Sequence, residues 1–333
     1  MVISMTPYRL SFFGGGTDYP AWYRENGGAV VSASINKYCY ITCRYLPPFF
    51  NHKHRFVYTE VENVVSISEI KHPAIKAVLE SMNWGKEGLE IHHDGDLPAR
   101  SGLGSSSSFT VGLLNALTSL IENPLTKRGL ADKAIHVEQN IIKESVGSQD
   151  QIASAYGGIN KIEFARDDTY DVQPIILTPE KKKYLESHFM LFFTGISRYA
   201  TEAAKSQIKN IGARKKELTR IKQTVDEALS LIYSSRSFAP ELGDLMHEAW
   251  RYKRSLSDKV SNKIIDDIYE AARESGAYGG KLMGAGAGGF MVFIVKPELQ
   301  ERVIERLKGL TYVPFEFENF GSKIALYQPN GLG

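Results

Sequence analysis

Apolar residues in the first hundred positions gather in short runs that are rich in β-branched and aromatic side chains. Four of these runs are YRLSFF, AVVSASI, YCYITCRYL and RFVYTEV, and glycine, proline and asparagine punctuate the sequence around them. This is the pattern of β-strands joined by turns. A single short helix is predicted over residues 73–83, so the first part of the chain is expected to be mainly sheet.

From Ser105 onward, apolar residues recur at three- and four-residue spacing, which indicates amphipathic helices. SSSFTVGLLNALTSLIE is the first predicted helix and TKRGLADKAIHVEQNII the second, with Thr126 as its N-cap. HFMLFFTG is predicted to be a buried strand. Further helices are predicted over residues 200–234, 240–257, 264–275 and 297–307, and further strands at FMVFIV and KIALY. The charged residues of the two long helices are interpreted as solvated faces.

Helices and strands mixed in this way predict an α+β protein, and a length of 333 residues favours two domains or one large one. The segment TPEKKKYLES, which begins at Thr178, is polar and is expected to be irregular, so we place a division there. The predicted domains are residues 1–183 and 184–333.

Charge and composition argue against several classes of protein. The formal net charge of +2 comes without a basic tail, so no nucleic-acid partner is expected. MVISMTPYRL lacks the features of a signal peptide, and no apolar run is long enough to cross a bilayer, so no membrane partner is expected. Cys39 and Cys43 would share one face of a strand, where disulfide geometry is rare, and we interpret them as free buried thiols. These features favour a cytoplasmic protein.

The segment PARSGLGSSSS, residues 98–108, places glycines and serines directly before a predicted helix. Such residues are poor helix formers, but a helix N-terminus exposes unpaired N–H groups that attract anions. Small residues let a phosphate approach the backbone, and serine hydroxyls add donors or an oxygen ligand for Mg²⁺. The alternative is a flexible loop with a serine N-cap. The candidate phosphate-binding residues are Gly102, Leu103, Gly104, Ser105, Ser106, Ser107 and Ser108.

Two further glycine-rich loops lie near the two ends of the chain. In RLSFFGGGTDYP, Asp18 can accept hydrogen bonds from sugar hydroxyls and Arg9 can face a phosphate, although a tight turn with an Asx cap is the alternative. GAGAGGFMVFIV has the spacing G-x-G-x-x-G, but it leads into a strand and not a helix, which argues against dinucleotide binding. SGAYGGKL lacks the P-loop residues at both ends.

In this order, RLSFFGGGTDY, PARSGLGSSSS and KLMGAGAGGF resemble the motifs of the GHMP kinases, the superfamily of galactokinase, homoserine kinase, mevalonate kinase and phosphomevalonate kinase. The resemblance extends over nearly the whole chain. It implies an α+β two-domain fold, with an N-terminal domain like the second domain of ribosomal protein S5, a ferredoxin-like C-terminal domain, and the active site in the cleft. It also implies that the serine-rich loop holds the phosphates of ATP. The last loop would pack beside it through Gly284, Gly286, Gly288 and Gly289.

The resemblance also implies where the chemistry takes place. In HVEQNIIKESVGSQDQIASAYGG, Glu138 matches the acidic magnesium ligand and Asp150 the aspartate base, while Ser106 matches a magnesium-contacting serine. Phosphoryl transfer needs neutralisation of phosphate charge and a base beside the attacking hydroxyl. Arg9 joins Asp150 in the candidate catalytic set. An exposed helix residue is the alternative for Glu138, and a helix N-cap is the alternative for Asp150.

The first loop distinguishes branches of the family. Galactokinases have glutamate and histidine where this chain has Gly15 and Gly16, which argues against galactose. Together with LPPFFNHKHRFVY and FTGISRYA, this loop looks most like the D-glycero-D-manno-heptose 7-phosphate kinases. Such kinases phosphorylate the anomeric hydroxyl to give the 1,7-bisphosphate, for nucleotide-activated heptose and capsule or surface-glycan synthesis. The implied substrate-binding residues are Arg9, Gly15, Gly16, Thr17, Asp18, Gly157, Gly158 and Arg198.

The phosphate that such a sugar carries needs cationic ligands. Arg198 is the preferred one, because a glycine-containing turn after a buried strand should face the cleft. The other basic candidates are Lys281, His52, Lys53, His54 and Arg55. The HKHR run is interpreted as a solvated hairpin, and a zinc site from its histidines and His92 and His93 is not expected, since their spacing matches no known ligand pattern.

Other functions stay open. Another sugar 1-kinase, of the L-fucose type, is the alternative among enzymes. A kinase-like sugar sensor would be expected to have lost the base or the metal ligand, and both candidates are present. A decarboxylase of the same superfamily fits the first loop less well. The expected cofactors and partners are ATP, Mg²⁺ and a sugar phosphate, and a homodimer is left open.

Overall fold

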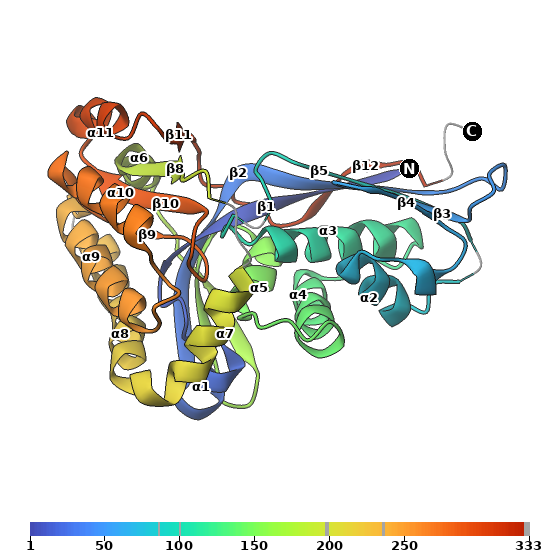
Figure 1. The fold of residues 1–333 in the computed structure, drawn as a ribbon, viewed down its shortest axis with the longest axis horizontal. Coiled ribbons are helices and arrows are strands. Elements are labelled where there is room, and N and C mark those ends of the chain that lie inside the picture. Colours follow the sequence, from blue (N-terminus) through green and yellow to red (C-terminus); the bar gives the residue numbers. More distant parts are fainter. Residues whose placement is uncertain (86, 100, 197–199, 235–236, 330–333) are drawn as a thin grey trace.

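The computed structural model describes residues 1–85, 87–99, 101–196, 200–234 and 237–329, and its described strands form two sheets (Figure 1). The strands of the first sheet are β1 (Val2–Phe13), β2 (Gly28–Tyr45), β3 (His54–Val57), β4 (Val61–Val64), β5 (Leu89–Gly95), β6 (Ile159–Phe164), β7 (Tyr170–Pro174) and β12 (Lys323–Tyr327). Their order is β12-β1-β2-β5-β3-β4, and β6 pairs with β2 and β7. The expected sheet in the first hundred residues is confirmed, with AVVSASI and YCYITCRYL joined in the single strand β2.

The second sheet belongs to the C-terminal part of the chain. Its strands are β8 (Phe189–Phe193), β9 (Ala277–Leu282), β10 (Phe290–Val295) and β11 (Thr311–Tyr312), in the order β11-β8-β10-β9. The buried strands predicted at HFMLFFTG and FMVFIV are confirmed as β8 and β10. Every residue of β10 is buried, as expected for a central strand that is covered on both faces.

The helices before β8 are α1 (Pro20–Asn26), α2 (Pro73–Ser81), α3 (Ser105–Leu120), α4 (Lys127–Ile135), α5 (Gln149–Tyr156) and α6 (Pro179–His188). Those after it are α7 (Ala200–Asn210), α8 (Lys215–Ser234), α9 (Ala239–Ser255), α10 (Lys263–Glu274) and α11 (Gln300–Arg306). Helices α2, α3, α4 and α5 lie on one side of the first sheet, and α9 and α10 lie beside β9 of the second sheet (Figure 1). Short 3₁₀ turns occur at Ile67–Glu69, Ile211–Arg214 and Pro297–Leu299, and a π-helical segment at His136–Ile141. No described helix is long and apolar enough to span a bilayer.

Helix α3 forms the centre of the N-terminal core. It lies against β1 and β2, and its residues are buried from Ser107 to Leu120. A helix that is apolar on nearly all sides is stable only when other elements surround it. The first turn of α3, with its serines, therefore has a fixed place beside the sheet.

The end of the chain returns to the first sheet. Strand β12 pairs in antiparallel fashion with β1, with Val2 opposite Tyr327. Ile35 of β2 also forms an isolated bridge with Phe317. The predicted division at residue 183 falls inside α6, and the two halves of the sequence share part of their packing.

Three expectations were wrong in detail. TPEKKKYLES is not irregular but contains α6, because Thr178 caps the Lys181 N–H at 3.3 Å and proline follows at the first helical position. The helix predicted over residues 200–234 is interrupted by the turn at Ile211–Arg214. The HKHR run is not a fully solvated hairpin, since His54 in β3 is buried between β4 and β5. The N-cap role predicted for Thr126 is confirmed, because its side chain accepts from the Gly129 N–H at 3.1 Å.

Candidate active site

Two glycine-rich loops, one from each sheet, lie in direct contact. The Phe290 N–H donates to Ser101 O at 3.1 Å. A Cβ atom on Gly289 would lie 2.1 Å from Ser101 O, and one on Gly102 would lie 2.5 Å from Met283 O. Glycine is therefore required on both sides for this close approach. The structure brings the loop of Gly284 to Gly289 against the serine-rich loop.

The serine-rich loop ends at the N-terminus of α3. Gly104 is the N-cap residue and adopts a left-handed conformation with φ 77°, which a glycine accepts without strain. It has no side chain to cap the first-turn N–H groups, and this turn contains no acidic residue. Ser106 is exposed, whereas Ser108 is buried and donates to Pro7 O at 3.1 Å. The exposed side of this turn can receive an anion.

Arg9 and Asp150 form a two-pronged ion pair beside this turn. Arg9 Nε donates to Oδ1 of Asp150 at 2.7 Å, and Nη2 donates to Oδ2 at 2.6 Å. Arg9 Nη1 also donates to Gly102 O at 2.8 Å. A Cβ atom on Gly104 would lie 3.4 Å from Oδ2 of Asp150, so the carboxylate stands at the start of α3. The Arg9 side chain is 3% exposed but that of Asp150 is 25% exposed, so solvent or a substrate can reach this carboxylate.

Glu138 lies in the π-helical segment that follows α4. There the Ile142 N–H donates to Val137 O, five residues back, at 2.9 Å, and the widened turn directs Glu138 inward. Its Oε2 atom accepts from Ser107 Oγ at 2.9 Å and from Gln151 Nε2 at 2.5 Å. The alternative of an exposed helix residue is wrong, because Glu138 is fully buried.

Two features of Glu138 fit a divalent cation. Its Oε1 atom is buried and has no hydrogen-bond partner among the described residues. Burial raises the pKa of this carboxyl to about 7, and the polar contacts of Thr110, Gln151 and Ser107 lower it only in part. A hard cation would satisfy Oε1 and hold the group ionised. Among the described residues no three His, Cys, Asp or Glu side chains are grouped to hold a metal, so a cation here would need further ligands such as ATP phosphates.

The first glycine loop folds around Asp18. The Gly16 N–H donates to Oδ1 of Asp18 at 2.8 Å. This donor lies two residues before the aspartate and not two after it, so the contact is not the Asx cap considered as an alternative for this loop. Gln149 Nε2 donates to Oδ2 at 3.0 Å, so Asp18 is adjacent to the residue before Asp150. Burial raises the pKa of Asp18, and the Gly16 N–H opposes this rise. Thr17 is buried, and Gly14 O at 2.8 Å and Ala29 O at 2.9 Å share its single hydroxyl hydrogen, which holds the loop on the sheet.

Two buried lysines also reach this loop, and sequence reasoning overlooked the first of them. Lys253 of α9 donates from Nζ to Gly15 O at 3.1 Å. Lys281 of β9, which was only one of several basic candidates, donates from Nζ to Ser11 O at 2.8 Å. The sequence contained one signal for Lys253. Met246, Ala249, Trp250 and Leu256 form an apolar stripe at helical spacing, and Lys253 interrupts it.

The remaining candidate residues lie elsewhere. Gly157 and Gly158 follow the far end of α5, roughly 10 Å along the helix from Asp150 at 1.5 Å per residue. A Cβ atom on Gly157 would lie 2.0 Å from the Phe320 carbonyl carbon, and the Gly158 N–H donates to Glu318 O at 2.9 Å. These two glycines thus pack on the C-terminal segment. Arg198 lies outside the described residues.

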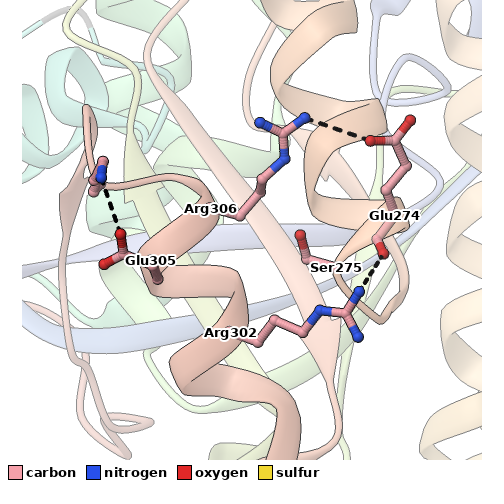
Figure 2. Close-up of a pocket in the computed structure, with 6 residues that line it drawn as sticks. Glu274, Ser275, Arg302, Glu305 and Arg306 are labelled. Atoms are coloured by element: carbon pink, nitrogen blue, oxygen red, sulfur yellow. Dashed lines mark hydrogen bonds and ion pairs between the residues drawn. The ribbon is translucent and has the colours of Figure 1, made fainter.

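A groove of about 560 Å³ lies apart from these loops, on α10 and α11 (Figure 2). Its basic side chains already have partners. Arg306 pairs with the Glu274 carboxylate at 3.5 Å, Arg302 donates to Glu274 O at 3.4 Å, and Lys308 pairs with Glu305 at 3.0 Å (Figure 2). None of the candidate catalytic residues lines this groove, so it is not the active site.

Comparison with known proteins identifies the family to which this chain belongs. The GHMP kinases N-terminal domain matches residues 68–158, and the GHMP kinases C-terminal domain matches residues 228–312. A D-glycero-alpha-D-manno-heptose 7-phosphate kinase from Campylobacter jejuni is 30% identical over 332 residues, which cover 96% of this chain and 97% of that protein. The chain belongs to the GHMP kinase family. It is therefore a small-molecule kinase, an enzyme that transfers phosphate from ATP to an alcohol.

Two further proteins are similar to this chain over most of its length. The crystal structure of a D-glycero-D-manno-heptose 1-phosphate kinase from Bacteroides thetaiotaomicron matches with a TM-score of 0.81 and 25% identity, and the match covers 98% of this chain and 100% of that one. The bifunctional fucokinase/GDP-fucose pyrophosphorylase of Arabidopsis thaliana is 26% identical over 90% of this chain, which corresponds to 31% of that longer protein. The predicted α+β fold with two GHMP kinase domains is thus confirmed.

Proposed function

We propose that this chain phosphorylates the anomeric hydroxyl of D-glycero-D-manno-heptose 7-phosphate with ATP and releases the 1,7-bisphosphate. The observation that carries the proposal is the Arg9–Asp150 pair, whose carboxylate stands at the serine-rich start of α3. A base beside an anion-binding helix end is what phosphoryl transfer to a hydroxyl requires. The choice of sugar rests on the first loop and on the names of the two heptose-phosphate kinase relatives.

Each candidate residue has a role in this reaction. The first-turn N–H groups of α3 and the side chains of Ser105 and Ser106 hold the ATP phosphates. The hydroxyls predicted for this role at Ser107 and Ser108 are instead buried and donate to Glu138 and to Pro7 O. Asp150 accepts the proton of the anomeric hydroxyl while the hydroxyl oxygen bonds to the γ-phosphorus. The bond from that phosphorus to the bridging oxygen breaks, and ADP leaves. Arg9 holds the carboxylate in one orientation through its two hydrogen bonds.

The magnesium ion that we propose as cofactor neutralises phosphate charge when it is bound. Glu138 and Ser106 are its proposed protein ligands. Ser107, which donates to Glu138, orients the carboxylate. Glu138 thereby has a partner on one oxygen and an unused lone pair on the other.

The sugar is proposed to lie at the first glycine loop. Both carboxylate oxygens of Asp18 already accept one hydrogen bond, and each has a further lone pair for a sugar hydroxyl. Gly15 and Gly16 have no side chains that would separate the sugar from this carboxylate. Gly157 and Gly158 are assigned to packing, because the structure separates them from Asp150.

The proposed setting follows from the reaction. A sugar phosphorylated at its anomeric carbon is a precursor of nucleotide-activated heptose for surface glycans, and the need for ATP places the enzyme in the cytoplasm. The domain limits at residues 183 and 184 and a homodimer stay predictions. Limited proteolysis tests the first, and light scattering after size-exclusion chromatography tests the second.

The deciding experiment measures ADP formation with heptose 7-phosphate, heptose 1-phosphate, free heptose, L-fucose and galactose, with Asp150→Asn as the control for background hydrolysis. We expect the highest kcat/KM with heptose 7-phosphate and a new phosphate signal at carbon 1 in the phosphorus NMR spectrum of the product. Equal use of L-fucose would favour the fucokinase-like alternative, which the Arabidopsis relative supports. Exclusive use of heptose 1-phosphate would mean that the enzyme phosphorylates the hydroxyl at carbon 7 and not the anomeric hydroxyl.

A further inference from the structure

Lys253 and Lys281 come from the C-terminal part of the chain, yet both end at the first glycine loop. Lys253 Nζ donates to Gly15 O at 3.1 Å across 238 positions of sequence. Lys281 Nζ donates to Ser11 O at 2.8 Å and to Phe12 O at 3.2 Å. The two lysines are only 6% and 7% exposed. The reaction described above gives neither of them a role.

Their hydrogen-bonding capacity is only half used. Each ammonium group has three N–H donors. In the described part of the chain, Lys253 uses one donor and Lys281 uses two, all on backbone carbonyls. Unused donors inside a protein cost free energy unless a ligand or water accepts them. The remaining donors therefore need an acceptor with several lone pairs.

The charges around the lysines do not cancel. Arg9 and Asp150 neutralise each other, and Asp18 is the further carboxylate whose charge acts on both lysines. Within the described residues, neither ammonium group has a carboxylate at ion-pair distance. Burial lowers the pKa of Lys253 to about 8 and that of Lys281 to about 7, and the charges of Lys253 and Arg9 add to the second shift. A bound anion would stabilise the charged form of both lysines.

Gly15 lies beside polar atoms from three elements, β1, α5 and β9. A Cβ atom on Gly15 would lie 3.3 Å from Ser11 Oγ, 3.9 Å from Gln149 Nε2 and 3.9 Å from Lys281 Nζ. Ser11 Oγ is buried without a hydrogen-bond partner among the described residues and can donate to a phosphate, and Gln149 Nε2 has a second N–H besides the one that it donates to Asp18. Gly15 has no side chain that would separate these polar atoms from a ligand.

We propose that Lys253 and Lys281 form a phosphate-binding site at the Gly15 loop, which Ser11 and Gln149 complete. A phosphate group offers many acceptor lone pairs and negative charge, which match the spare donors and the excess of positive charge. This phosphate is either the one that the sugar carries or the one in transfer from ATP. The first source rests on the proposed function, whereas the second requires only that the chain is a kinase.

A purely structural role is the competing explanation. In that case the lysines would only join the C-terminal elements to the carbonyls of residues 11, 12 and 15. Glutamine separates the two roles, because its amide can donate to a carbonyl but has no charge. Lys222 of α8 provides a matched control, since its Nζ donates to Asn26 O at 3.1 Å and so makes the same kind of contact away from the Gly15 loop.

The test titrates inorganic phosphate into the full chain and follows the midpoint of thermal unfolding, with and without a saturating non-hydrolysable ATP analogue. The proteins are the wild type, Lys253→Met, Lys281→Met, Lys253→Gln, Lys281→Gln and the control Lys222→Met. Binding of the ATP analogue and circular dichroism check that each variant is folded. If a methionine variant does not fold, the glutamine variant at that position decides. The titration contains no sugar, so its result is independent of whether heptose 7-phosphate is turned over.

We expect phosphate to stabilise the wild type and Lys222→Met, and its apparent affinity to fall about 10-fold or more in the variants of Lys253 and Lys281. This pattern with the analogue bound identifies the phosphate of the sugar as the ligand. The same pattern only without the analogue identifies the phosphate in transfer. The proposal is overturned if phosphate does not stabilise the wild type in either condition, or if the glutamine variants bind phosphate as the wild type does.

Discussion

The two sets of cations at the first glycine loop differ in how they are compensated. Arg9, from the first sheet, has all three of its hydrogen-bonding nitrogens engaged, two of them with Asp150. Lys253 and Lys281, from the C-terminal elements, contact only backbone carbonyls. The Arg9–Asp150 pair is thus complete without a ligand, whereas the two lysines still lack an anion.

This difference indicates a division of labour between the two parts of the chain. A preformed ion pair holds a catalytic carboxylate in place before the substrate arrives, as efficient proton transfer requires. Buried groups with unmet charge and unused donors reduce stability, and such groups are found most often where a ligand completes them. In the proposed mechanism, the N-terminal elements supply the geometry for proton transfer, and the C-terminal lysines supply attraction for a phosphate.

The largest expected effect comes from breaking the preformed pair. Asp150→Asn keeps the size of the side chain but removes the proton acceptor, so kcat should fall by roughly 10²- to 10⁴-fold. ATP binding should change little, because the proposed phosphate-binding groups are at the start of α3 and not on Asp150. The measurements are the rate of ADP formation and calorimetric binding of ATP. Near-normal turnover by a folded Asp150→Asn protein would exclude Asp150 as the base.

The Arg9–Asp150 pair and the lysines also differ in how far sequence reasoning could locate them. The candidate base was found because the segment with GSQD resembles the part of the GHMP kinases that contains an aspartate base. Its ion pair with Arg9 spans 141 positions, and no local pattern encodes that contact. Lys253 was hidden because α9 carries many charges, which were interpreted as a solvated face. Only its place in the apolar stripe of α9 marks it as buried.

Similar reasons explain the successes and failures in the fold. Strands β1, β2 and β10 and helix α3 were predictable from the sequence. Each of them is largely buried, and its own apolar residues show this burial. Pairing of β12 with β1 joins the two ends of the chain, which periodicity cannot reveal. The π-helical segment of Glu138 was also missed, since its wider turn depends on packing around a buried carboxyl and not on residue type.

The second prediction tests whether the positive charge of Lys281, which has no carboxylate partner among the described residues, binds a phosphate. Lys281→Met should lower kcat/KM for the sugar phosphate by about 10- to 150-fold, the range for one charge-assisted contact. A loss confined to KM, with free heptose unaffected, would place the sugar's own phosphate at this site. A loss in kcat with both sugars would place the transferred phosphate there. Lys222→Met should behave as the wild type, and equal behaviour of Lys281→Met would remove the distinction between the two sets of cations.

The third prediction concerns the buried carboxyl of Glu138. Its pKa is raised to about 7 by burial, so protons compete with Mg²⁺ below that pH. The Mg²⁺ concentration for half-maximal rate should therefore increase as pH falls below about 7, by up to roughly tenfold per pH unit. In Glu138→Gln the requirement for Mg²⁺ should be higher and nearly independent of pH. Rates measured across Mg²⁺ concentrations at several pH values test this, and an unchanged curve in Glu138→Gln would argue against a metal-binding role.

The same pKa predicts the direction of the stability change without metal. The folded protein binds the Glu138 proton more tightly than the unfolded chain does. This contribution is complete below the ordinary pKa of glutamate and is lost as the pH rises through about 7. Thermal unfolding of the wild type with EDTA should show this loss, Mg²⁺ with ATP should offset it, and Glu138→Gln should lack it. Loss of the same size in Glu138→Gln would assign the pH dependence to other groups.

The smallest effect distinguishes Ser106 from Ser107, which the sequence alone could not separate in a run of four serines. Ser107 is buried and donates to Glu138, so Ser107→Ala should lower the free energy of unfolding by about 0.5–1.5 kcal/mol, the usual net value of one hydrogen bond. Ser106 is exposed, so Ser106→Ala should leave stability within about 0.5 kcal/mol of the wild type, as surface substitutions usually do. If Ser106 contacts the cation, its loss should instead raise the Mg²⁺ requirement of the reaction. Urea unfolding without metal and rates across Mg²⁺ concentrations separate these effects. An unchanged Mg²⁺ requirement in Ser106→Ala, together with a raised one in Ser107→Ala, would assign the metal contact to the buried serine through Glu138.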